Sequence, residues 1–83
     1  MTQPADQPDL EAIMQFDPED GIAELDRHLD GLRDAAEKRG FVFDRHAARN
    51  ELQAATFGRQ RPATARLLLS PTGAMAIEVR AAE

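Results

Sequence analysis

The chain has 83 residues, no cysteine or tryptophan, and a net charge of −5 at pH 7. This excludes a disulfide framework, a cysteine metal site and a thiol nucleophile, and the length suits one domain that buries about 60% of its unfolded surface. The N-terminus is no secretory signal and no apolar stretch approaches the roughly 18 residues of a membrane span, so we expect a cytoplasmic protein. The abundance of Ala, Arg and Asp is typical of a bacterial protein.

Residues 1–8 are polar, contain two prolines and show no periodicity, which predicts a disordered tail before a single domain at 9–83. A short helix is predicted next, capped by Asp9 and ended by Asp17-Pro18, because a residue before proline leaves the helical region. Its apolar residues share one helical face: Leu10, Ile13 and Met14.

A long helix is predicted at 18–39, with Asp17 as its N-cap and Gly40 as the left-handed residue that ends it. Gly31 inside this helix lowers its stability by about 1 kcal/mol relative to alanine. The glycine either allows another element to pack closely or is merely tolerated by the helix. The apolar stripe of this helix steps by three and four residues: Ile22, Leu25, Leu29, Leu32 and Ala36. This spacing suits a core, and it would also suit a homodimeric helix pair.

The second half of the chain predicts an extended segment at 41–43, a helix at 45–58 capped by Asp44, and a hairpin at 65–80. The hairpin turn is Ser70-Pro71-Thr72-Gly73, with proline and glycine where a type I turn and a glycine bulge require them. We therefore expect a small α+β domain in which two or three helices pack on a C-terminal antiparallel β-hairpin or three-stranded sheet.

Charge divides the chain into two halves. Residues 1–44 carry four basic and twelve acidic side chains, a net −8, whereas residues 45–83 carry six basic and three acidic ones, a net +3. Two partner-binding surfaces are candidates: an acidic one of Asp26, Asp30 and Asp34, and a basic one of Arg45, Arg49, Asn50, Arg59 and Arg61. Alternatively, these charges are solvated and neutralise each other within one fold.

Catalytic, metal and cofactor roles are not expected. His28 and His46 fall on different predicted helices without a nucleophile or a third ligand, and Ser70 is explained by the turn. The glycines are isolated, so they form no phosphate-binding loop.

The sequence therefore favours a non-catalytic module that binds another protein as a small regulator, inhibitor or accessory subunit, and we expect a homodimer. Leu68 on an otherwise polar hairpin face is a candidate dimer or strand-edge contact. The alternative is a nucleic-acid-binding regulator, because the basic helix at 45–58 followed by a hairpin resembles part of a winged-helix domain. The acidic net charge opposes that alternative.

Overall fold

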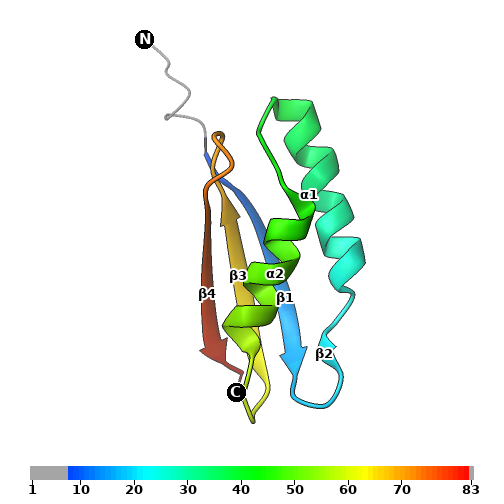
Figure 1. Cartoon of the computed structure of the whole chain (residues 1–83), viewed down its shortest axis with the longest axis vertical. Coiled ribbons are helices and arrows are strands. Elements are labelled where there is room, and N and C mark those ends of the chain that lie inside the picture. Colours follow the sequence, from blue (N-terminus) through cyan, green and yellow to red (C-terminus); the bar gives the residue numbers. More distant parts are fainter. Residues whose placement is uncertain (1–7, 83) are drawn as a thin grey trace.

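Figure 1 shows a computed structural model of the chain, which describes residues 8–82, so the predicted tail lies almost wholly outside the described residues. The model confirms the α+β class. In chain order the elements are β1 (Leu10–Asp17), β2 (Gly21–Ile22), α1 (Leu25–Arg39), α2 (Arg45–Thr56), β3 (Ala63–Leu69) and β4 (Met75–Ala81). No helix within residues 8–82 is long and apolar enough to cross a membrane.

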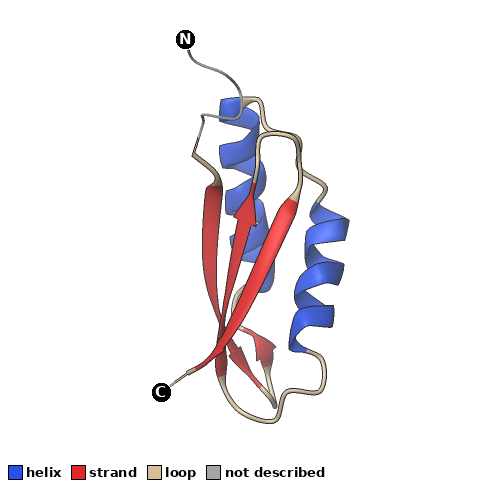
Figure 2. Ribbon diagram, turned by 90° about the vertical axis from the view of Figure 1, so that its left-hand side faces the viewer, coloured by secondary structure: helices blue, strands red, loops and turns tan. Residues whose placement is uncertain are grey.

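The four strands form one antiparallel sheet in the order β2-β1-β3-β4. Both helices lie on the same side of this sheet, and no helix of residues 8–82 covers its other side (Figure 2). Alternate residues of each strand therefore face the helices or the uncovered side. The largest fully buried side chains lie between the layers: Met14, Leu29, Leu52, Leu67 and Leu69.

The predicted helix around residues 9–14 is wrong, because this segment belongs to β1. The strand pairs along its length with β3, from Leu10 opposite Leu69 to Phe16 opposite Ala63. This pairing buries Met14 and Phe16 against the helices and leaves the Ile13 side chain 51% exposed on the uncovered side. The sheet thus has four strands rather than two or three.

The predicted start of the long helix at residue 18 is also wrong, since α1 begins at Leu25. Gly21 adopts a φ of +82°, which turns the chain back so that β2 pairs with the end of β1. The Asp17 carboxylate does cap backbone groups, but they belong to this turn: it accepts hydrogen bonds from the N–H groups of Glu19 and Asp20 at 2.9 and 3.1 Å.

The junction between the helices was predicted more accurately. Gly40 ends α1 with a φ of +73°, and the Phe41 N–H donates to the Ala36 carbonyl at 2.8 Å. Asp44 caps α2, because its carboxylate accepts a hydrogen bond from the Ala47 N–H at 3.0 Å. The extended segment at 41–43 is a loop rather than a third strand, and its Phe41 side chain is buried.

The hairpin prediction is confirmed, with β3 and β4 joined by the expected turn. The Gly73 N–H donates to the Ser70 carbonyl at 3.0 Å, and the Gly73 φ of +97° is the left-handed value that a glycine bulge needs. The preceding helix ends at Thr56, two residues before the predicted end at 58, which leaves Phe57 89% exposed.

Candidate functional site

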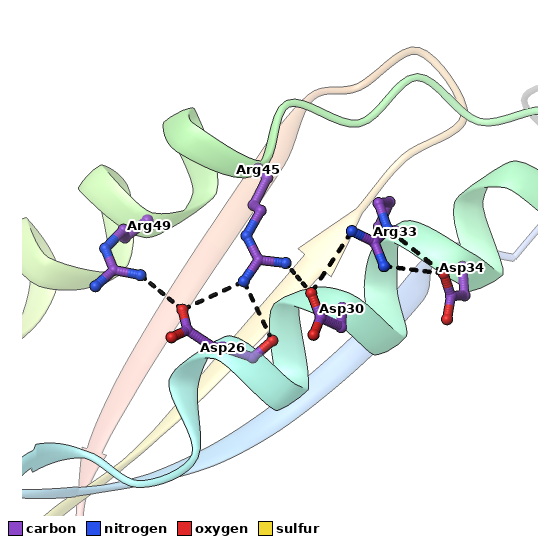
Figure 3. A network of polar contacts seen from close by, with 6 residues as sticks. All are labelled: Asp26, Asp30, Arg33, Asp34, Arg45 and Arg49. Atoms are coloured by element: carbon purple, nitrogen blue, oxygen red, sulfur yellow. Dashed lines mark hydrogen bonds and ion pairs between the residues drawn. The ribbon is translucent and has the colours of Figure 1, made fainter.

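Two arginines of α2 bridge to two aspartates of α1 across the helix pair, and Figure 3 shows this arrangement. Arg49 Nη1 lies 2.7 Å from Asp26 Oδ1, and Arg45 Nη2 lies 3.2 Å from the same oxygen. Arg45 also forms an ion pair with Asp30. We call these four residues the interhelix ion-pair network. It joins Asp26 and Asp30 of the predicted acidic surface to Arg45 and Arg49 of the predicted basic surface.

The network stabilises the charged forms of Asp26 and Arg45. Hydrogen bonding from Arg49, followed by its positive charge, holds the pKa of the Asp26 carboxyl below its ordinary value. The hydrogen bond to Asp30 raises the pKa of the Arg45 guanidinium. Both groups therefore stay ionised at neutral pH, and their charges are directed at each other rather than left free for a partner. A partner-binding role for them stays a prediction.

Asp34, the third member of the predicted acidic surface, is linked to this network through Arg33, whose Nη1 lies 3.7 Å from Asp30 Oδ1 (Figure 3). Asp34 faces away from α2 and pairs with Arg33 of its own helix, at 3.4 Å. Asn50 is exposed on α2. Arg59 and Arg61 are exposed in the loop between α2 and β3, and neither forms an ion pair with another of residues 8–82.

Leu68 lies on the uncovered side of the sheet and is partly buried there. Its strand β3 pairs with β1 and with β4, so Leu68 is not at a strand edge, and a dimer contact stays a prediction. The same side is crossed by ion pairs of Arg66, which contacts Glu11 on β1 and lies 3.6 Å from Glu78 on β4. These contacts, the one with Glu11 above all, raise the pKa of the Arg66 guanidinium. The uncovered side is therefore a mixed apolar and charged surface.

A groove between α1 and the outer edge of β1 was not predicted from the sequence. It has a volume of about 550 Å³, within the range of roughly 300–1,000 Å³ that is typical of ligand pockets. We call it the β1–α1 groove. Its lining consists of four residues of β1 and six from α1 and its N-cap: Leu10, Glu11, Ala12, Ile13, Glu24, Arg27, His28, Gly31, Leu32 and Ala35.

The α1 side of this groove combines a charged end with a row of small residues. Glu24, the N-cap residue, has a left-handed φ of 52°, and its carboxylate pairs with Arg27 at 3.0 Å. His28 is half-buried. Gly31 is exposed, and a Cβ placed on it would meet nothing within 4 Å. Gly31 therefore does not mark close packing; it leaves open space along the groove.

The two histidines remain apart in the fold, with half-buried His28 lining the groove on α1 and exposed His46 on α2. Within residues 8–82, no three or more His, Asp or Glu side chains gather in a way that would hold a metal ion.

No protein-family model matches the chain, and no curated protein matches its sequence. Among solved structures, it is similar to a "putative amino-acid aminotransferase" from Mesorhizobium loti, with a TM-score of 0.85 and 26% sequence identity. The match covers 93% of this chain and 37% of that protein. The fold described above thus recurs there as one part of a chain more than twice as long.

Proposed function

We propose that this chain is a non-catalytic domain that acts by binding a second protein unit, of the kind that makes up the rest of an aminotransferase. One observation carries the proposal: nearly all of this chain superposes on little more than a third of the Mesorhizobium loti protein. In that protein the remaining part belongs to the same polypeptide. Here we expect another chain to supply a comparable unit.

The surfaces of the domain support a binding role. The β1–α1 groove leaves apolar side chains and a strand edge open, and the uncovered side of the sheet holds the half-exposed Ile13. Phe57 adds an almost fully exposed aromatic ring, a side chain enriched at protein interfaces. Such features are typical of a domain that is completed by a neighbour.

An accessory subunit agrees best with these features, and a regulator or inhibitor of an aminotransferase-like enzyme would use the same surfaces. We place this association in the cytoplasm of a bacterium, and we expect the chain to form a homodimer. The nucleic-acid alternative gains no support from the fold, because Arg45 and Arg49 are paired with aspartates of α1.

The test is affinity purification of the tagged chain from its native host, followed by mass spectrometry of the proteins bound to it. The expected partner has an aminotransferase-like sequence that lacks its own counterpart of this domain. A Leu67→Asp variant, in which a charge replaces a fully buried side chain, serves as the unfolded control. Nucleic acid as the sole co-purifying species, or no aminotransferase-like protein above the control, would overturn the proposal.

A further inference from the structure

We propose that the β1–α1 groove binds an extended, uncharged segment of a partner protein, which adds to the sheet as a strand beside β1. The inference rests on the proposed function in one respect, namely that the segment belongs to the partner unit. The binding mode itself follows from the main chain of β1, the shape of the groove and the distribution of charge around it.

Among the described residues 8–82, no strand pairs with the outer edge of β1 over most of its length. Strand β2 has only two residues and pairs with Phe16 and Asp17, and one further hydrogen bond runs from the Ala23 N–H to the Gln15 carbonyl at 2.8 Å. Both main-chain groups of a strand residue point to the same side, and the side alternates along the strand. The groups of Glu11 and Ile13 therefore point outward, as those of Gln15 do.

The groove follows this edge rather than one face of the sheet. Its lining includes Ala12, which faces the helices, and Ile13, which faces the uncovered side. The opposite wall is α1, where Gly31 and Ala35 present little side-chain bulk. An extended segment placed here would have main-chain partners on β1 and room for its own side chains against α1.

The charges at the groove are already compensated within the chain. Glu24 pairs with Arg27 at 3.0 Å, and Glu11 pairs with Arg66 of β3. A charged side chain that entered the groove would gain no free counter-charge from these residues, because both ion pairs are already formed. The electrostatic complement of the groove is therefore an uncharged segment, and half-buried His28 offers it one polar side-chain contact.

Two variants and one matched control separate strand addition from other contacts. Ile13→Pro removes an outward N–H that the pairing with β3 does not use, so the sheet can keep its ladder. Ile13→Ala removes the same side chain but keeps the N–H, and is the matched control. Gly31→Trp fills the groove from the α1 side, where nothing lies within 4 Å of an added Cβ. Thermal melting establishes that each variant is folded.

The probe is a phage-displayed library of short peptides that alternate Val or Ala with Thr or Ser, selected on the purified chain. A second library carries Lys or Glu at every other position. We expect enrichment from the uncharged library alone. A synthetic selected peptide should bind about tenfold more weakly to Ile13→Pro and to Gly31→Trp, while Ile13→Ala changes its affinity about threefold at most.

Absence of enrichment, enrichment of charged peptides, or equal affinity for the wild-type chain and Ile13→Pro would each overturn the inference. The purification from the native host then distinguishes the two proposals. If Ile13→Pro and Gly31→Trp capture the aminotransferase-like partner as well as the wild-type chain does, the groove assignment fails and the proposed function stands. If selected peptides occupy the groove but no such partner is captured, the proposed function fails alone.

Discussion

Gly31 and Gly40 lie in and just after the same helix, but their backbone requirements differ. Gly31 has open space around it, whereas Gly40 has a φ of +73°. Gly31→Ala should raise the free energy of unfolding by about 1 kcal/mol, because alanine has the higher helix propensity. Gly40→Ala should lower it by about 1–2 kcal/mol, because a Cβ disfavours left-handed backbone. Urea denaturation monitored by circular dichroism measures both, and a loss of stability in Gly31→Ala would contradict the account.

Gly73 combines a positive φ with a close neighbour. Its φ is +97°, and an added Cβ would lie 3.0 Å from Val42 Cγ1. Gly73→Ala should therefore destabilise the domain by about 1–3 kcal/mol, and the loss is larger the less Val42 can move away. A Gly73→Ala/Val42→Ala double variant, measured by thermal unfolding, should recover only the part of the loss caused by Val42 Cγ1, because the Val42 Cβ and carbonyl oxygen would still lie 3.2 and 3.3 Å from the added Cβ. Full recovery would show that the backbone conformation contributes nothing.

At the scale of elements, the interhelix ion-pair network should make the α1–α2 contact sensitive to pH. The pKa of Asp26 lies below its ordinary value of 3.8 in the folded chain. Its contribution to stability is therefore complete above that ordinary value and is lost as the pH falls through the lower folded-state pKa. Because Asp26 is 70% exposed, the contribution is small.

Asp26→Asn should accordingly melt at a lower temperature than the wild type at pH 7, with the difference shrinking below pH 3.8 and in high salt. Asp34→Asn is the control, since Asp34 pairs only within α1 and repels Asp30 one turn away. We expect no loss of stability from it. A difference for Asp26→Asn that persists unchanged at acid pH would show that the ion pairs are not its cause.

The elements that the sequence predicted correctly depend on local signals. Gly40 and Asp44 act through backbone groups within a few residues, and the turn at 70–73 requires only its own glycine and proline. Strand β1 lacks such a signal, because its inward residues include small Ala12 while Ile13 points outward. Leu10, Ile13 and Met14 therefore suggest a helix, and only pairing with the distant β3 decides in favour of a strand.

The same dependence on local signals explains which parts of the candidate site could be predicted from the sequence. Opposite charges in the two halves indicated that neutralisation within the fold was one outcome, and the Asp26, Asp30, Arg45 and Arg49 contacts realise it in part. The groove could not be predicted, because it exists only when β1 is a strand with an open edge. Gly31 was the one local sign of it, and a glycine inside a helix has several explanations.

At the scale of the whole molecule, helices cover only one side of the sheet, so neighbouring residues of β3 contribute differently to the free energy of unfolding. Leu67 is fully buried against the helices, whereas Leu68 is only partly buried on the uncovered side. Leu67→Ala should cost about 2–5 kcal/mol, a large share of the stability of a small domain. Leu68→Ala should cost about 1 kcal/mol or less. Chemical denaturation compares the two, and similar losses would mean that something also covers the second side.

The central ladder of the sheet has a consequence for synthesis of the protein. It pairs Leu10 with Leu69 and Phe16 with Ala63, partners that are 59 and 47 residues apart in the chain. Strand β1 leaves the ribosome before its partner β3, which emerges only after both helices have been made. During translation the apolar residues of β1 therefore wait for their partner strand, and the domain can complete its core only once the hairpin has cleared the exit tunnel.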